Sequence, residues 1–213
     1  MMNAHNCRWY FVLALASLVP MGATLEAVRA QESAPKAEKS APRAPSLPAT
    51  PAERDRILAA RYAKLAAAKD DSESKSVEDR IERVWLHSGS PTVDLLFGRA
   101  MRAVAEKDFD QALLFLNHVV EQAPDFAEGW SRRAYVHFQR NDVVLALGDL
   151  RRALALDPSN FKVLDGLGQV LRDVDEKPAA LAVMRRLFKV HPRWPGVEKA
   201  VQELAREVEG QPI

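Results

Sequence analysis

The side chains that most often perform catalysis or bind metal ions are few in this sequence. The only cysteine, Cys7, lies near the N-terminus, and the histidines beyond it are far apart: His87, His118, His137 and His191. Zinc ligands usually come as Cys or His pairs a few residues apart, and none of these four has a second ligand at that spacing. His137 lies among apolar residues at helical spacing, so we expect it to pack in a core. The sequence therefore predicts no catalytic residue, no metal ligand and no enzyme.

One short glycine pair, Gly166 and Gly168, invites comparison with a nucleotide-binding loop. A dinucleotide-binding loop has a third glycine and follows a β-strand, and both features are missing here. The apolar residues around the pair instead recur every three or four positions, which is typical of a helix. We therefore expect no nucleotide and no other cofactor.

The overall charge is nearly balanced, with 30 Lys and Arg residues against 29 Asp and Glu residues. A nucleic-acid-binding protein generally needs a clear basic excess on one face. Glycines (9) are fewer than prolines (13), which is unlike a turn-rich β-sandwich or barrel. The composition therefore disfavours nucleic acid as a partner and β-structure as the fold.

Residues 1–30 have the pattern of a secretory signal peptide. Arg8 precedes an apolar run over residues 9–19, and small residues mark several cleavage points, the last of them after Ala30. A helix of that run reaches about 16 Å, which is too short for a bilayer core of about 30 Å. We therefore expect cleavage, export to the bacterial periplasm and no membrane span in the mature chain. Cys7 lies before the apolar run instead of after it, which does not fit a lipoprotein.

Residues 31–51 carry five of the 13 prolines and only one large apolar residue, Leu47. Such a segment buries too little surface to offset the loss of chain entropy on folding. We expect a disordered Pro/Ala-rich linker, which is either a spacer or an inert leader after the signal.

The strongest pattern in the chain is a repeat of 34 residues. It divides the chain into repeats at 93–126, 127–160 and 161–194, and the apolar residues of each repeat indicate two helices joined by a polar turn. Residues 195–209 have one apolar and one charged face, as expected of a capping helix. The repeated small residues and prolines are Ala100, Ala134 and Gly168; Ala112, Ala146 and Ala180; and Pro124, Pro158 and Pro192.

These helix pairs resemble tetratricopeptide repeats (TPRs) of an exported type, over residues 93–194 and the capping helix. The middle repeat matches best, because the family has its Trp, small residues and Pro where this chain has Trp130, Ala134, Ala146, Ala153 and Pro158. The resemblance implies an all-α fold, namely a right-handed α-solenoid of antiparallel helix pairs with a C-terminal capping helix.

Residues 52–92 precede the repeats and contain two further helical patterns, over 52–69 and 77–88. Counting back 34 residues places Tyr62 in the Trp position of a repeat. This segment is therefore either a degenerate fourth repeat or an N-terminal cap of unrelated helices. In both cases we expect the polar residues 70–76 to form a loop.

The resemblance also implies a groove lined by the first helix of each repeat, which suits an extended peptide or a partner helix. The family's carboxylate clamp for chaperone tails needs Lys and Asn where this chain has Phe97 and Met101, so chaperone tails are disfavoured. Alternatively, Phe97 and Met101 pack against the upstream helices and line no groove. The expected lining residues are Phe97, Met101, Ser131, Arg132, Tyr135, Lys162, Asp165, Gln169 and Arg172.

Two arginine pairs one repeat apart fall on the second helices and form a basic ridge, which consists of Arg151, Arg152, Arg185 and Arg186. A solvated basic face is the simplest interpretation of this ridge, and a site for an anionic partner is the other.

These features favour an exported scaffold or adaptor that binds a protein or peptide partner in the cell envelope. The alternatives are a self-associating structural protein of the envelope and a regulatory subunit of an envelope enzyme. We expect a monomer or a weak homo-oligomer. The fold by itself does not identify the partner, because TPR folds have many unrelated roles.

Overall fold

The computed structural model describes residue 48 and residues 50–210 of the 213-residue chain. This described part contains helices and no β-strand, which confirms the expected all-α fold. The predicted signal peptide and nearly all of the predicted linker lie outside the described residues. In the described part, no helix combines the length and apolar character needed to cross a membrane. The helices are α1 (Pro51–Ala66), α2 (Asp71–Trp85), α3 (Pro91–Ala105), α4 (Phe109–Gln122), α5 (Ala127–Gln139), α6 (Val143–Leu156), α7 (Phe161–Asp173), α8 (Lys177–Val190) and α9 (Val197–Glu209).

The helix pairs α3–α4, α5–α6 and α7–α8 all turn at a residue with left-handed backbone conformation. These residues are Lys107, Asn141 and Asp175, with φ of 60°, 65° and 60°, and they recur at the spacing of the sequence repeat. In each case the backbone N–H of the following residue donates a hydrogen bond to a carbonyl of the first helix, as Asp108 N does to Ala103 O at 2.9 Å. The same hydrogen-bonded turn therefore sets the same antiparallel geometry in all three pairs.

The repeated small residues lie where the two helices of a pair cross. Ala100, Ala112 and Ala146 are fully buried. Gly168 marks a close approach, because a Cβ atom placed there would lie 2.4 Å from Met184 Cε. The helices of a pair approach closely because no larger side chain holds them apart.

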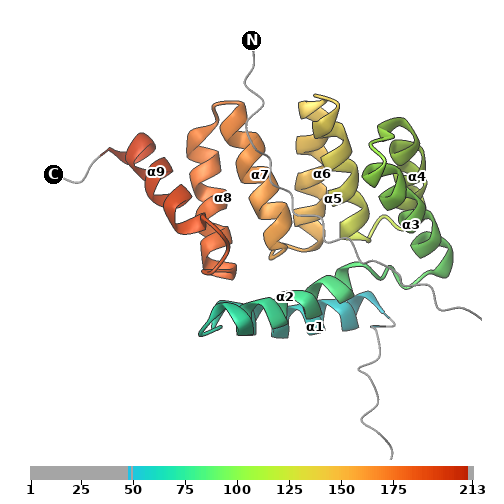
Figure 1. The fold of residues 1–213 in the computed structure, drawn as a ribbon, viewed down its shortest axis with the longest axis horizontal. Helices are drawn as coiled ribbons and strands as arrows, with labels where there is room; N and C mark the ends of the chain where they lie inside the picture. Colours follow the sequence, from blue (N-terminus) through green and yellow to red (C-terminus); the bar gives the residue numbers. More distant parts are fainter. Residues whose placement is uncertain (1–47, 49, 211–213) are drawn as a thin grey trace, which may run out of the picture. The chain divides into compact units, whose positions relative to one another are not determined.

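The first two helices do not continue the solenoid. α1 and α2 form a hairpin that runs across the loops between the repeats and packs on α8, instead of stacking on α3 and α4 (Figure 1). Tyr62 accordingly contacts Asp157, which lies in the loop between α6 and α7. The interpretation of residues 52–92 as a degenerate fourth repeat is therefore wrong.

The polar stretch 70–76 is mostly helical, so the predicted loop there is also wrong. The Asp70 side chain caps α2 by accepting a hydrogen bond from Glu73 N at 2.8 Å. Asp71 and Glu73 lie in the first turn, where acidic side chains interact favourably with the helix dipole. Capping and charge therefore start this helix before its first apolar residue.

Candidate functional site

The first helices α3, α5 and α7 carry the nine residues expected to line a groove, and we call the surface that these nine define the first-helix face. Six of them occupy repeat-equivalent positions, in the columns Phe97, Ser131, Asp165 and Met101, Tyr135, Gln169. The structure gives the three helices different environments on this face.

On α3, Phe97 does not line a groove, because its side chain is only 4% exposed. Its ring meets that of Phe126 edge-on, with centroids 5.3 Å apart. Phe97 therefore fills the core between α3 and the turn before α5, and its partner belongs to its own repeat instead of the upstream hairpin. Met101 is half-buried at the edge of the same core and keeps part of its surface in solvent.

On α5, Ser131 is buried, whereas Arg132 and Tyr135 are half-buried. The Arg132 guanidinium lies 2.6 Å from a carboxylate oxygen of Glu128, one helical turn earlier. Tyr135 packs at the edge of the core that contains Phe97. This part of the face therefore offers a guanidinium already held by an acid, beside an aromatic ring.

On α7, the ends of the helix differ in accessibility. Lys162, in the first turn, pairs with Glu82 of α2, with 2.8 Å between Nζ and Oε1, so the hairpin holds it. Arg172, near the other end, is exposed. The accessible part of the first-helix face consequently lies away from the hairpin.

Asp165 lies between these two ends and has an unusual electrostatic environment. Burial raises the pKa of its carboxyl from 3.8 to about 6, although the Trp194 indole and the Gln169 amide donate to it. The Gln169 Nε2 atom lies 2.7 Å from Asp165 Oδ2. Both donors are neutral, so they offset only part of the cost of holding a buried carboxylate.

A buried polar cluster fixes the hairpin to the solenoid. Tyr62 Oη donates to Asp157 Oδ2 at 2.6 Å, and Trp85 Nε1 donates to the same oxygen at 3.0 Å. Burial raises the pKa of the Asp157 carboxyl, while these two hydrogen bonds act in the opposite direction. Sequence reasoning missed this cluster, because its members lie on three separate elements. A polar Asp157 just before a helix-ending Pro158 was the only local signal.

A second anchor holds the other end of the hairpin. His191 is 1% exposed, and its Nε2 atom lies 3.0 Å from a carboxylate oxygen of Glu78 on α2. Arg193 donates to the carbonyl of Ala68 at 3.1 Å and to the Asp71 carboxylate at 2.8 Å. Both residues belong to the loop between α8 and α9, so the hairpin is tied to two inter-repeat loops.

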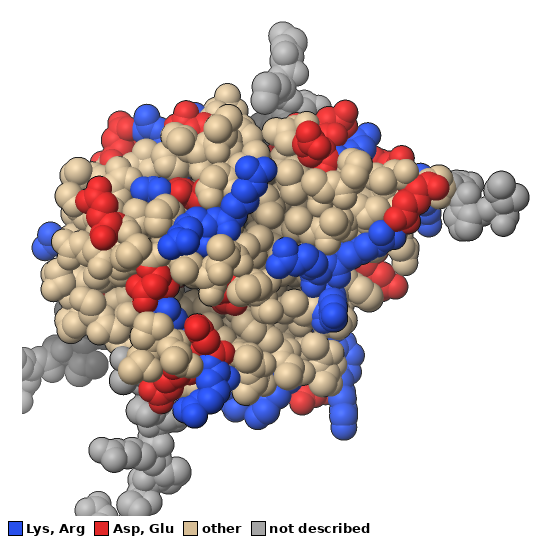
Figure 2. Space-filling model, turned by 180° about the vertical axis from the view of Figure 1, so that it is seen from behind, with Lys and Arg blue, Asp and Glu red and all other residues tan. Residues whose placement is uncertain are grey.

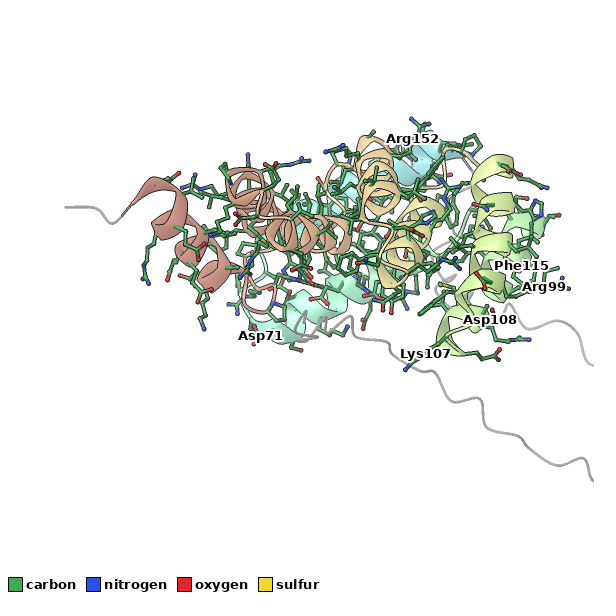
Figure 3. The ribbon with its side chains drawn as sticks, turned by 90° about the horizontal axis from the view of Figure 1, so that it is seen from above. Asp71, Arg99, Lys107, Asp108, Phe115 and Arg152 are labelled. Carbon is green, nitrogen blue, oxygen red and sulfur yellow. The ribbon has the colours of Figure 1, made fainter. Side chains whose placement is uncertain are left out.

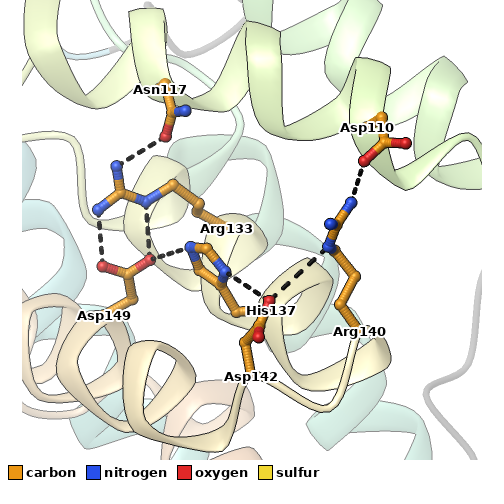
Figure 4. A network of polar contacts seen from close by, with 7 residues as sticks. All are labelled: Asp110, Asn117, Arg133, His137, Arg140, Asp142 and Asp149. Atoms are coloured by element: carbon orange, nitrogen blue, oxygen red, sulfur yellow. Dashed lines mark hydrogen bonds and ion pairs between the residues drawn. The ribbon is translucent and has the colours of Figure 1, made fainter.

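A polar network joins the first and second repeats (Figure 4). Arg133 binds both carboxylate oxygens of Asp149, at 2.7 and 2.8 Å, and donates to Asn117 Oδ1 at 3.0 Å. His137 lies 3.9 Å from Asp149, and burial lowers its pKa. Arg140 pairs with Asp110 across the repeats. The network ties α4 to α5 and α6, and within the described residues no group of His, Cys, Asp or Glu side chains is arranged to hold a metal ion.

The basic ridge is exposed but mostly engaged. Arg152 and Arg186 donate to the carbonyls of Pro124 and Pro158, at 3.5 and 3.0 Å, so each bridges to the preceding repeat. Arg185 binds both carboxylate oxygens of Glu209, at 2.7 and 2.8 Å. Figure 2, the view from behind, shows both basic and acidic side chains spread over that face of the protein. Three of the four ridge arginines therefore already have an acceptor within the protein, although their side chains remain exposed to solvent.

The architecture defines the class as an α-helical repeat protein, and comparisons with known proteins specify the repeat. The family model described as a tetratricopeptide repeat matches residues 127–160, the middle repeat. A TPR repeat-containing protein of Rhizobium etli is 28% identical over 176 residues, which cover 76% of this chain and 86% of the relative. The Hsp70-Hsp90 organizing protein of Triticum aestivum is 34% identical over 98 residues, 46% of this chain and 16% of that protein.

Solved TPR domains share the fold. The Arabidopsis OM64 TPR domain has a TM-score of 0.52 and 17% identity, and the match covers 55% of this chain and 97% of that domain. The first TPR of Spaghetti (RPAP3), bound to the HSP90 peptide SRMEEVD, has a TM-score of 0.52 and 15% identity, with 55% and 93% of the two chains covered. The fold is therefore an all-α TPR solenoid, and the matches together support a TPR repeat protein.

Proposed function

We propose that this protein is an exported adaptor that binds an extended segment of a partner protein on its first-helix face. One observation carries this proposal: packing leaves Met101, Tyr135 and Arg172 at least partly exposed, on three successive first helices. A segment laid across these helices meets an apolar side chain at α3, an aromatic ring at α5 and a cation at α7. Such a sequence of contacts suits an extended peptide with an apolar anchor.

The chemistry of the face argues against acidic chaperone tails as the partner. The related domain of Spaghetti is bound to an HSP90 peptide. By resemblance, a clamp for such a tail needs Lys and Asn at the positions of Phe97 and Met101, where this chain has a buried ring and a thioether. We therefore expect no saturable binding of the peptide SRMEEVD to this protein.

Export to the periplasm is the second part of the proposal, and the signal-like residues 1–30 support it. Expression of the full chain in a bacterium with a periplasm, followed by fractionation, tests this part. We expect the protein in the periplasmic fraction, shortened at its N-terminus. Deletion of residues 9–19 should leave it in the cytoplasm, and an unshortened chain in the cytoplasm of wild type would refute export.

Binding is tested by cross-linking in envelope extract. We expect the variant Met101→Glu/Arg172→Glu to lose the proteins that wild type captures. The matched control is Leu145→Glu/Arg206→Glu, which likewise replaces one apolar residue and one arginine by Glu, at exposed positions of α6 and α9. Circular dichroism establishes that both variants fold. Equal capture by wild type and both variants would refute binding at the first-helix face.

A further inference from the structure

The outer side of the first helix pair exposes positions that the other repeats cover. In the second and third repeats these positions are buried or half-buried, and Val136 and Val163 have no exposed surface. In the first repeat Leu95 is 59% exposed, and Arg99 and Arg102 are exposed as well. The four columns are Leu95, Gly129, Val163; Arg99, Arg133, Leu167; Arg102, Val136, Val170; and Phe115, Asp149, Val183.

In the second repeat, the second helix of the preceding repeat covers these positions. A Cβ atom on Gly129 would lie 2.8 Å from Val119 Cγ1 on α4, and Arg133 donates to Asn117 on the same helix. Among the described residues no such helix precedes the first repeat, because the α1–α2 hairpin lies across the loops instead. Figure 3 accordingly shows Arg99 and Phe115 on the side of α3 and α4 that faces away from α5 and α6. We call the surface formed by Leu95, Arg99, Arg102 and Phe115 the open end.

The open end combines apolar surface with unneutralised positive charge. The Arg99 guanidinium lies over the Phe115 ring, 6.0 Å from its centroid, where Arg133 instead has the carboxylate of Asp149. No ion pair among the described residues neutralises Arg99 or Arg102. The equivalent arginine of the second repeat, Arg133, donates to Asn117 of the preceding helix, whereas no preceding helix among the described residues gives Arg99 an acceptor.

We propose that the open end binds an acidic amphipathic helix of another protein, which takes the place of a preceding second helix. The bound helix places a small residue against Leu95, where the second repeat has only glycine, and a carboxylate against Arg99. A second copy of this chain fits poorly, because two apposed open ends would bring four guanidinium groups together. The bound helix therefore needs two features, a small residue and an acidic residue two positions before it, as Asn117 lies two positions before Val119 on α4.

A synthetic helix derived from α4 is the probe. It has the sequence of residues 109–122 with Asn117→Glu and Val119→Ala. It also carries Asp110→Asn. In the second repeat Asp110 pairs with Arg140, but the equivalent residue of the first repeat is Glu106, which would repel a carboxylate. A hydrocarbon staple on its solvent side keeps this short peptide helical, since isolated helices of this length are marginal in water. Fluorescence anisotropy measures its binding to the full chain.

We expect Arg99→Glu to weaken binding by about tenfold or more, as is usual for the loss of a close charge pair. A second peptide with Lys in place of the introduced Glu should show the reverse preference and bind Arg99→Glu better than wild type. The matched control is Arg206→Glu, at an exposed arginine of α9, which should bind like wild type.

Two results would overturn the proposal. Equal affinity of Arg99→Glu and Arg206→Glu for the probe would show that the arginines only make the end of the solenoid soluble. The second result would come from light scattering. If the full chain is a dimer and Leu95→Asp converts it to a monomer, the open end binds a second copy of this chain instead of another protein. Leu95 is exposed, so this variant should fold, and circular dichroism checks that it does.

Discussion

Asp165 on the first-helix face allows the sharpest test of the site, because its carboxyl is held in its ionised form at a cost to the fold. We expect Asp165→Asn to stabilise the protein at neutral pH. The pKa rises from 3.8 to about 6, which corresponds to about 3 kcal/mol of unfavourable free energy once the group is ionised. The side chain is partly accessible, and Asn accepts weaker hydrogen bonds from Trp194 and Gln169, so we expect a net gain of about 1–2 kcal/mol.

The same shift determines the pH dependence. The folded state keeps the Asp165 proton up to about pH 6, whereas the unfolded chain releases it near pH 4. Between these values the folded state binds more protons, so the stability contributed by this group falls as the pH rises and becomes constant above about pH 7. The advantage of Asp165→Asn should therefore be near zero at pH 4 and fully developed at pH 7.5.

Urea unfolding followed by circular dichroism at pH 4.5, 6 and 7.5 measures this difference. Asp173→Asn is the matched control, because Asp173 is an exposed carboxylate at the end of the same helix. A difference between wild type and Asp165→Asn that stays constant with pH would refute the reasoning, as would a loss of stability at pH 7.5. If a partner supplies a cation to Asp165, the same variant should bind that partner more weakly although it is more stable.

Three further predictions concern the fold. Tyr62→Phe removes the hydroxyl that donates to Asp157, and we expect a loss of about 1–2 kcal/mol, with faster hydrogen exchange in α1 than in α5. Lys107→Gly relieves a left-handed backbone conformation and should raise the free energy of unfolding by about 0.5–1 kcal/mol in urea melts; an unchanged midpoint would contradict this. Gly129→Ala should cost about 1–2 kcal/mol, because the new Cβ meets the stiff Val119 side chain. Gly168→Ala should cost less, because the unbranched Met184 side chain can rotate away from the new Cβ; equal midpoints in thermal melts would contradict this contrast.

The local pattern of the chain predicts much of the solenoid. Columns such as Ala100 and Ala112 report close helix crossings, since only a small side chain lets two axes approach, and the polar breaks between them coincide with the turns at Lys107 and Asn141. Each of these features involves neighbours within one repeat, so a period of 34 residues is enough to reveal it.

The repeat pattern predicts less about the candidate site. Position in the repeat identified which residues share the first-helix face, but it did not show that Phe97 is covered by Phe126 or that Lys162 is held by Glu82. Burial depends on what packs against a face, and a periodic pattern records only that the face is apolar or polar. The accessible remainder, with Arg172 and the perturbed Asp165, emerges only when these contacts are known.

The sequence by itself determined the helix pairs, their turns and their order along the chain, because these depend on contacts between residues close in sequence. Only the tertiary structure decided where the α1–α2 hairpin lies. Its anchors, Tyr62 on Asp157 and Glu78 on His191, join residues 95 and 113 positions apart. Such contacts leave no periodic trace, since each is made once, by geometry and not by repetition. That placement also decides which two surfaces we propose as binding sites. The hairpin shields one end of the first-helix face, and among the described residues it leaves the outer side of the first repeat uncovered.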